Sequence, residues 1–563
     1  MRLTLLAKSA AMTLFCGLFA AVVCAQTAAD ADATPGSVAG MVVDGVSGSP
    51  LSKTRLLLRS LQEGGSSATG TSDAQGRFVI LNLAPGRYRL YAERSRYARS
   101  EYGQKAPGRP GTILTVQAGR QVRDIVVGLT RAGVITGRVV DDDGEPLERV
   151  GVSAMGFRYV QGKKQLTQLG QASTNDWGEY RIFGLEPGRY FISVNRMREG
   201  RFPGGRRGRV APPAMEIEIP IYYPGVAEVD QAVPVDLVAG AELQGIDVQT
   251  RQFRTARITG TVIEQATGGA TRRNTALVLL PRNARIAPSF SGLNRTTTRG
   301  ADGAFEISGV LPGSYTLVAQ VLDRGNSAYG RLPVEIGDRD IQGLTINVSP
   351  GVRLQGSLRI EGDVSLEGAR IRVGARPLAA NALFAQGGGF AMVDADGDFV
   401  IGNVPPETFY LQLSGAPEDF YLKTAQLAGQ DVLSTGLDPT SGIISGRLEL
   451  TVSPKGGRFS GSVVTEGRQP FAGASVVLVP EKQRRQQTYL FKSTTTDQSG
   501  VFTLRGISPG KYEIFAWEAV ESGAWEDPDF LRDYEGEGRK IEITEGSSAN
   551  LELKLIPFGE SAR

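Results

Sequence analysis

The 563-residue chain contains no histidine, and its two cysteines, Cys16 and Cys24, both lie within the first 25 residues. The rest of the chain therefore has no residues for a Ser-His-Asp triad, a thiolate nucleophile or an ordinary His/Cys zinc site. It cannot form internal disulfides either, so each folded part must be stabilised by its own apolar core. These absences predict a protein with no catalytic residues, no metal ligands and no cofactor.

Long apolar runs are also missing after residue 25, so we expect no transmembrane segment in the mature chain. Residues 1–25 are typical of a secretory signal peptide, because Arg2 and Lys8 precede an apolar stretch too short for a comfortable span. Cleavage is expected after Ala25, which places the protein in the periplasm, at the outer membrane or outside the cell. The alternative is a lipoprotein anchored through Cys24, but the preceding Val23 is larger than the residues usual there.

A strong net charge is absent too. Removal of the signal peptide leaves 60 basic and 59 acidic side chains, a net charge of +1. Such a balance argues against nucleic acid as the partner, because nucleic-acid binding depends on an excess of positive charge.

A thirteen-residue motif recurs five times in the chain. Its pattern is Gly-x-aromatic-x-aliphatic-x-x-aliphatic-x-Pro-x-x-aromatic, and it begins at Gly76, Gly178, Gly303, Gly397 and Gly500. The intervals of 102, 125, 94 and 103 residues are each about the length of a small domain. A motif repeated at that spacing indicates a tandem array of one domain type.

Within each motif, alternating apolar residues predict two strands joined by a turn. A Pro-Gly pair is typical of a type II turn, in which glycine takes a positive φ at the third position. The predicted turn residues are Pro85, Gly86, Pro187, Gly188, Pro312, Gly313, Pro509 and Gly510. The fourth copy has Glu407 in place of this glycine, so we expect a different turn there.

Further short strands before and after each motif bring the number to roughly seven per hundred residues, as in a β-sandwich. We therefore predict an all-β fold of five sandwich domains after the signal peptide. The boundaries follow from the repeat: a flexible leader at 26–36, then domains at 37–130, 131–252, 253–350, 351–453 (the most divergent) and 454–563.

The chain resembles bacterial secreted proteins that carry tandem carboxypeptidase regulatory-like domains. The resemblance rests on the Gly-x-Val-x-Asp openings, as at Gly40, and on the Asp-x-x-Gly-x-Phe…Pro-Gly-x-Tyr centres, as at Asp73–Tyr88. It implies transthyretin-like, immunoglobulin-like sandwiches of the carbohydrate-binding-like fold. It implies no peptidase activity, because the zinc of the namesake enzymes is held by a separate catalytic domain that has no counterpart here.

The sequence offers three chemical alternatives to a purely structural chain. Ser508 and Lys511 match a Ser-x-x-Lys dyad but belong to the repeated turn. The run Asp394–Asp398 resembles a calcium loop, yet Gly and Glu are not at the positions an EF-hand requires, so we expect a solvated turn, with a weak calcium site in a sandwich loop as the alternative. A carboxylate pair acting as a glycan hydrolase stays open, since Asp and Glu are abundant.

The candidate ligand-binding residues are aromatic and basic. Trp177 lies in a polar turn and is expected to be exposed, and Tyr222 and Tyr223 could stack on sugar rings. Arg206, Arg207 and Arg209 could bind an anionic group. The alternatives are that these tyrosines close the end of a sandwich and that the arginines belong to a solvated Gly/Arg loop. Trp517 falls on the opposite face of the strand from Tyr512 and Ile514, so we expect it to reach the surface as well. We expect a binding or scaffold protein with a glycan or a cell-envelope protein as partner.

Overall fold

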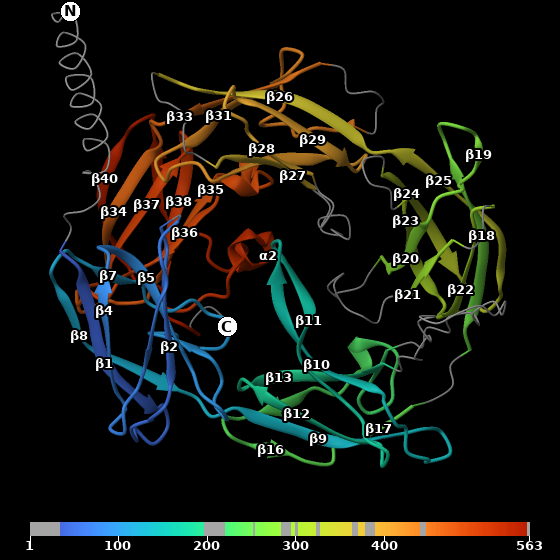
Figure 1. Ribbon diagram of the computed structural model, residues 1–563, viewed down its shortest axis with the longest axis horizontal. Helices are drawn as coiled ribbons and strands as arrows, with labels where there is room; N and C mark the ends of the chain where they lie inside the picture. The colour runs from blue at the N-terminus through green and yellow to red at the C-terminus, as the bar shows by residue number, and fades with distance from the viewer. Residues whose placement is uncertain are drawn as a thin grey trace, which may run out of the picture. The chain divides into compact units, whose positions relative to one another are not determined.

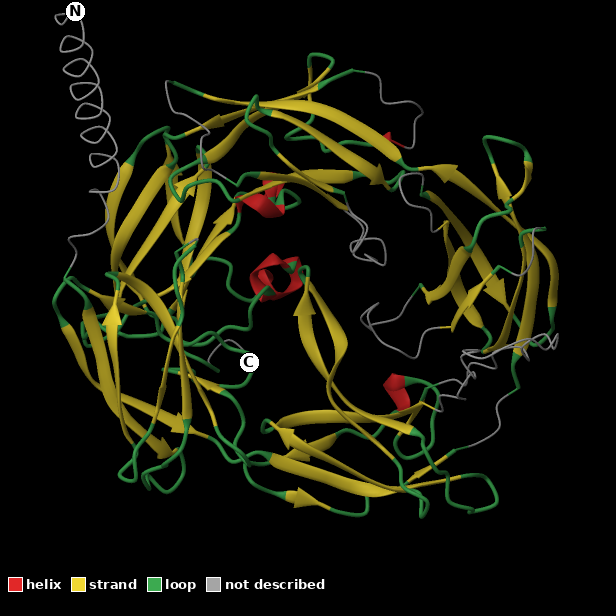
Figure 2. Ribbon diagram, viewed as in Figure 1, coloured by secondary structure: helices red, strands yellow, loops and turns green. Residues whose placement is uncertain are grey.

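The computed structural model describes residues 34–62, 64–195, 220–250, 254–282, 294–298, 302–321, 327–362, 370–377, 389–439 and 446–559. Within these residues the regular secondary structure is almost wholly β-strand, joined by loops and a few short helical turns (Figure 2). The residues form two compact units. The first extends to Arg94 and includes Arg99–Tyr102 and Ile113–Leu129, and the second holds Ser95–Ala98, Gly103–Thr112 and everything from Thr130 onward. No described helix is long and apolar enough to cross a membrane.

The first unit contains two sheets, with strand orders β4-β1-β8 and β3-β2-β5-β6, and β7 also pairs with β5. Its strands are β1 Gly36–Asp44, β2 Arg55–Ser60, β3 Ala68–Thr71, β4 Arg77–Leu83, β5 Gly86–Glu93, β6 Ser100–Glu101, β7 Leu114–Val116 and β8 Gln121–Leu129. The opening strand β1 is antiparallel to β4 and parallel to β8. In the other sheet, β2 is antiparallel to both β3 and β5.

The same pairing recurs four times in the second unit, and we number the resulting groups of sheets as sandwiches one to five. The second comprises β9 Gly133–Val140, β10 Gly151–Val160, β11 Lys163–Ser173, β12 Glu179–Leu185, β13 Gly188–Asn195, β14 Ile221–Tyr222, η1 Val229–Gln231, β15 Val235–Leu237, β16 Glu242–Leu243 and β17 Val248–Gln249. The third comprises β18 Ala256–Glu264, β19 Gly269–Ala270, β20 Thr275–Pro281, β21 Asn294–Thr297, β22 Ala304–Val310, β23 Gly313–Val321, β24 Ala328–Ile336 and β25 Ile341–Pro350.

The last two sandwiches follow the same order (Figure 1). The fourth comprises β26 Val352–Ile360, β27 Arg372–Pro377, β28 Phe390–Met392, β29 Asp398–Val404, β30 Phe409–Ser414, β31 Tyr421–Leu427, β32 Gln430–Asp431 and β33 Leu448–Ser453. The fifth comprises β34 Gly457–Val464, β35 Ser475–Pro480, η4 Lys482–Arg484, η5 Thr488–Leu490, β36 Lys492–Thr495, β37 Val501–Ile507, β38 Gly510–Trp517, η6 Ala524–Glu526, α2 Pro528–Arg532, β39 Arg539–Ile543 and β40 Ser548–Lys554.

The predicted all-β sandwich class is confirmed. Phe78 and Ile80 of β4 point inward with Val38 and Val42 of β1, and all four side chains are nearly inaccessible. This is the period-two burial expected when one face of a strand meets a second sheet. The division into five domains at the predicted boundaries stays a prediction. The signal peptide and most of the 26–36 leader lie outside the described residues, and β1 already begins at Gly36.

One glycine in each opening strand lets two backbones approach. At Gly40, Gly137, Gly260, Gly356 and Gly461 an added Cβ would lie between 1.8 and 2.7 Å from a carbonyl oxygen of the closing segment that runs parallel to the opening strand. Since real Cβ atoms do not come that close to backbone, only glycine allows this pairing.

The Pro-Gly turns differ from the prediction. Gly86 and Gly188 do not have a left-handed φ, and Gly313 and Gly510 have φ of 157° and 147°, far from the roughly +80° of a type II turn. The type II assignment is therefore wrong. Each glycine instead begins a strand. The fourth copy turns differently, as expected: Glu407 lies in a bend, its N–H donates to Pro405 O at 2.8 Å, and the strand begins only at Phe409.

The positive φ occurs four residues earlier in each motif. Asn82, Gly184, Gly309, Asn403 and Gly506 have φ between 56° and 79°. At the same place the register between the motif strand and the opening strand shifts by one residue. Each of these residues therefore forms a β-bulge, a conformation that favours Gly and Asn.

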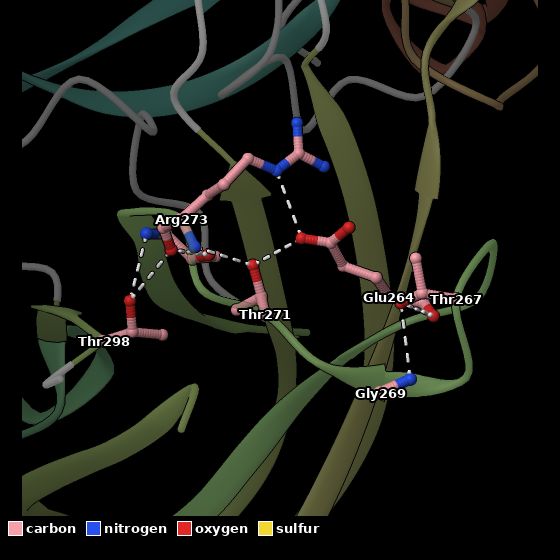
Figure 3. Close-up of polar contacts among 7 residues, drawn as sticks. Glu264, Thr267, Gly269, Thr271, Arg273 and Thr298 are labelled. Carbon is pink, nitrogen blue, oxygen red and sulfur yellow. Dashed lines mark hydrogen bonds and ion pairs between the residues drawn. The ribbon is translucent and has the colours of Figure 1, made fainter. Parts of the chain in front are cut away.

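A buried hydroxyl bridges two loops in four of the sandwiches. Thr496 Oγ1 donates to Phe471 O at 2.8 Å and accepts from Ala474 N at 2.9 Å, and Ser72 and Thr174 make the corresponding bonds. Thr298 has this role in the third sandwich, where it accepts from Thr275 N at 3.1 Å (Figure 3). Satisfying a buried amide in this way avoids a cost of roughly 1–3 kcal/mol.

Figure 3 also shows an ion-pair network beside Thr298. Glu264 Oε1 accepts from Arg273 Nε at 3.1 Å and from Thr271 Oγ1 at 2.7 Å. These hydrogen bonds hold the pKa of Glu264 below its usual range, with Arg273 as the larger cause. The network closes the loop that leads from β18 to β20.

Candidate functional site

The β10–β11 hairpin of the second sandwich departs from the repeat. Its strands have 10 and 11 residues, whereas the matching strands β35 and β36 have 6 and 4. Gln161 and Gly162 form the two-residue turn with φ of 51° and 69°. Positive φ at both positions defines a type I′ turn, whose twist matches that of the paired strands. The hairpin therefore extends beyond the sheet as a regular ribbon.

The second departure is the segment 518–538 of the fifth sandwich, which joins β38 to β39 and contains η6 and α2. Asp527 caps α2 by accepting from Asp529 N at 2.9 Å, and Pro528 occupies the first turn, where its missing N–H is harmless. The segment places Trp525, Phe530 and Leu531 over the outer face of β38.

This cover corrects the hypothesis that Trp517 reaches the surface. Trp517 is 2% exposed and stacks on Phe515 with ring centroids 4.8 Å apart, while Tyr534 meets it edge-on at 5.4 Å. The outer face of β38 and segment 518–538 thus enclose a second small hydrophobic core, separate from the core between the sheets.

The hairpin and segment 518–538 meet, as Figure 1 shows for β11 and α2. Tyr159 N donates to Glu521 Oε1 at 3.2 Å, and the Tyr159 ring meets Phe530 edge-on at 6.1 Å. A Cβ on Gly162 would lie 2.8 Å from Cβ of Glu526. The contact therefore combines an aromatic pair, a charge-assisted hydrogen bond and a close approach of the Gly162 backbone.

A cavity of about 510 Å³ lies at this contact. The hairpin contributes Phe157, Gly162, Lys163 and Lys164 to its lining, and segment 518–538 contributes Asp527, Pro528 and Asp529. Its volume is within the range of small-molecule sites, roughly 300–1,000 Å³. Since both walls are additions to the repeat, no other described sandwich has the same lining.

The charges in this cavity are divided between its walls. Lys164 Nζ lies 5.7 Å from the centre of the Phe157 ring, and Lys163 is exposed beside it. On the other wall, Asp529 pairs with Arg532, and one oxygen of Asp527 is used by the cap of α2. Nearby, burial raises the pKa of Glu526, and Arg376 opposes this shift at 3.6 Å.

The candidate residues named from the sequence do not form one site. Trp177 is 64% exposed, as expected, in the turn before β12. Tyr222 lies in β14 of the opposite sheet and is 1% exposed, so it cannot stack on a sugar; it packs with Met155 and Leu166. Tyr223 is half-buried against the main core. Arg206, Arg207 and Arg209 lie outside the described residues.

The carboxylate clusters are parts of turns. Asp394 Oδ1 accepts from Asp396 N at 3.1 Å and Asp398 N at 2.7 Å. Asp141, Asp142 and Asp143 lie close enough together to share an ion, but Asp141 Oδ1 already accepts from Asp143 N and Glu145 N. Such bonds are typical of solvated Asx turns.

The cavity residues were not predicted from the sequence. The available signal was local: Gln161-Gly162 between two long alternating runs predicts a type I′ hairpin. A second signal was that Phe515 and Trp517 fall on the face of β38 opposite to Tyr512 and Ile514. An apolar outer face requires a cover, which segment 518–538 provides.

No curated protein matches the chain. Among solved structures, a streptococcal ancillary pilin aligns with 56% of this chain and 99% of its own, at 14% identity and a TM-score of 0.19. The TIE protein of Bacillus anthracis aligns with 72% of this chain and 68% of its own, at 12% identity and 0.15. The minor pilin of Streptococcus agalactiae aligns with 39% and 96%, at 14% identity and 0.22. None of the three superimposes on the chain as a whole.

Residues 37–129 and 458–555 match the carboxypeptidase regulatory-like domain. These regions are the first and fifth sandwiches, and each contains the opening strand, the motif and the closing parallel strand. The resemblance to tandem carboxypeptidase regulatory-like domains seen in the sequence is thereby confirmed.

Proposed function

We propose that this protein is a non-catalytic binding and scaffold protein of the cell envelope, and that it presents its ligand site on a rigid series of β-sandwiches. The observation that carries the proposal is how the last three sandwiches join: the bulge residue of the fourth and of the fifth motif contacts the preceding sandwich.

At the junction of the third and fourth sandwiches the bulge residue is Asn403. Its carbonyl accepts from Tyr329 OH at 2.8 Å, and its side-chain oxygen accepts from Ser327 N at 3.2 Å. Glu407, the residue that replaces glycine in the fourth motif, pairs with Arg331 at 2.6 Å. The departure from the motif therefore serves the junction.

At the junction of the fourth and fifth sandwiches the bulge residue is Gly506. A Cβ there would lie 2.5 Å from Glu418 O and 2.6 Å from Phe420 O, so the two backbones are in close contact. Glu545 accepts from Lys423 Nζ, Tyr421 OH and Ser453 Oγ at 2.9 to 3.0 Å. Such side-chain networks fix orientation more than they add stability.

The lack of histidine, and of cysteine beyond residue 24, supports the non-catalytic part of the proposal. Location outside the cytoplasm is supported by the signal-peptide pattern of residues 1–25. A glycan is the first ligand class, by analogy with the carbohydrate-binding-like fold, and a protein of the envelope is the second. Binding to a glycan array distinguishes these two ligand classes.

The test uses chain 26–563 on an array of neutral, amino and acidic glycans, with turnover assays on the same glycans and on peptides. We expect retention of a glycan class without turnover. Binding of an envelope protein and of no glycan would change the ligand class. Hydrolysis abolished by one Asp or Glu substitution would overturn the non-catalytic proposal. Mass spectrometry of exported protein should find Gln26 at the N-terminus.

A further inference from the structure

We infer that the cavity between the β10–β11 hairpin and segment 518–538 binds an acidic saccharide, with its carboxylate on the hairpin lysines and its hydroxyls on the aspartates opposite. This inference rests on the proposed binding function and names the site and the ligand chemistry. The site differs from the residues that the sequence suggested, since it uses neither Trp177 nor the arginines at 206–209.

The hairpin wall supplies the positive charge. Lys163 and Lys164 are exposed at the cavity, and within the described residues no carboxylate lies at ion-pair distance from either ammonium group. Lys164 contacts the Phe157 ring, which holds its charge at the cavity. Two cations without partners on one wall favour a ligand with an anionic group.

The opposite wall limits how much negative charge that ligand can carry. Asp527 and Asp529 face the cavity, and a polyphosphate or a run of acidic side chains would be repelled by them. Carboxylates do accept hydrogen bonds from hydroxyl groups, and Asp527 keeps one oxygen beyond its bond to Asp529 N. A ligand with one acidic group and several hydroxyls therefore matches both walls.

Apolar surface completes the match. Phe157 is half-buried, and Pro528 stands at the start of α2 on the opposite wall. Sugar rings present C–H faces that pack on such surfaces while their hydroxyls bond to polar neighbours. An acidic peptide has fewer hydroxyl donors for the aspartates, so we place the saccharide first.

The two walls of the cavity belong to different sandwiches. Because one wall belongs to the second sandwich and the other to the fifth, a ligand in the cavity bridges both. Binding should therefore protect amides of the hairpin and of segment 518–538 together, whereas a ligand on a single sandwich would protect one set only.

The test measures binding of 3′-sialyllactose, a trisaccharide with a single carboxylate, to chain 26–563 by calorimetry and by hydrogen exchange, with maltotriose and a hexaglutamate peptide as comparators. We expect 3′-sialyllactose to bind, maltotriose to bind at least about tenfold more weakly, and the affinity for 3′-sialyllactose to fall with salt. Residues 157–165 and 521–530 should gain protection together.

The decisive variant is Lys163→Ala with Lys164→Ala, which should weaken 3′-sialyllactose binding at least about tenfold. Its matched control is Lys511→Ala with Lys540→Ala, which removes the same charge from β38 and β39 away from the cavity and should leave binding within about twofold. Equal loss in both variants, or none in either, overturns the cavity site while the binding function stands. Preference for hexaglutamate overturns the ligand class. Failure to bind any array glycan removes the glycan function as well.

Discussion

The repeated core and the two additions to it, the β10–β11 hairpin and segment 518–538, are stabilised by different kinds of interaction. In the core, the glycines of the opening strands and the bulge residues recur because backbone atoms leave no room for a Cβ or because φ is positive. In the additions, Tyr159, Glu521 and Phe530 act through side chains, and each could be replaced without breaking a strand. Substitutions in the core should therefore change stability, whereas substitutions in the additions should change binding and junctions.

The largest effect is expected at Gly461 of the opening strand β34. A methyl group there would lie 1.8 Å from Leu551 O, so Gly461→Ala should cost at least about 3 kcal/mol in the free energy of unfolding. Thermal melting followed by tryptophan fluorescence reports on this sandwich, because Trp517 and Trp525 are both buried in it. Gly467→Ala, in an open turn, is the control and should change the melt little. An unaltered melt for Gly461→Ala would contradict the close parallel pairing.

Two bulge glycines, one outside a junction and one within it, separate the cost of the left-handed backbone from the cost of the contact between sandwiches. Gly184 and Gly506 occupy the same motif position with φ of 79° and 60°, but a Cβ on Gly184 meets no other atom, whereas on Gly506 it meets two backbone oxygens. Alanine should cost roughly 1–2 kcal/mol at Gly184, from the left-handed backbone alone. At Gly506 the cost should be about 1–3 kcal/mol larger. If chemical denaturation gave equal costs for the two substitutions, the junction would accommodate the added methyl group at Gly506 without loss of stability.

The difference between the repeated core and its additions also explains which features could be predicted from the sequence. The sandwich class, the apolar faces and the Asx turns were predictable because period-two alternation and Asp-x-x-Gly are local signals. The bulges were not predicted, because the motif position of Asn82, Gly184 and Gly506 holds both Asn and Gly and lies inside an alternating strand pattern, so no local turn signal marks it. The cavity was not predictable, since it depends on two segments more than 350 residues apart, as Tyr159 and Glu521 show.

The junction of the fourth and fifth sandwiches should respond to acid. Hydrogen bonds from Lys423, Tyr421 and Ser453 lower the pKa of Glu545 to about 2. A carboxyl whose folded pKa is depressed stabilises fully above its unfolded pKa, about 4.3, and this contribution is lost as the pH falls toward 2. Between about pH 5 and pH 2 the melting temperature of the native chain should fall more than that of Glu545→Gln. Parallel pH profiles would show that Glu545 is not coupled to folding.

At the junction of the third and fourth sandwiches the pH dependence of stability has the opposite sign. Burial raises the pKa of Glu407, against the pull of Arg331. A carboxyl with a raised folded pKa binds its proton more tightly in the folded state, so protonation of Glu407 favours folding as the pH falls through that pKa. Replacing Glu407 by Gln should therefore remove a gain in stability that the native chain shows on acidification. Replacing Glu545 by Gln should instead remove a loss in stability. Comparing the two variants in one pH series tests both junctions.

The smallest effect is expected where the sequence predicted a large one. A type II turn would make glycine necessary at Gly188, but this residue begins β13 outside the left-handed region, and a Cβ there would meet only the Tyr190 ring at 3.9 Å. Gly188→Ala should therefore change the free energy of unfolding by less than about 0.5 kcal/mol. Ten residues earlier, Gly178 has φ of 71°, and its Cβ would lie 2.6 Å from Val139 O, so Gly178→Ala should cost at least about 2 kcal/mol. Both substitutions fall in one motif and one sandwich, so the same melt compares them directly. A cost above about 1 kcal/mol at Gly188 would restore the type II turn and move the strained residue of the motif from its bulge back to its Pro-Gly pair.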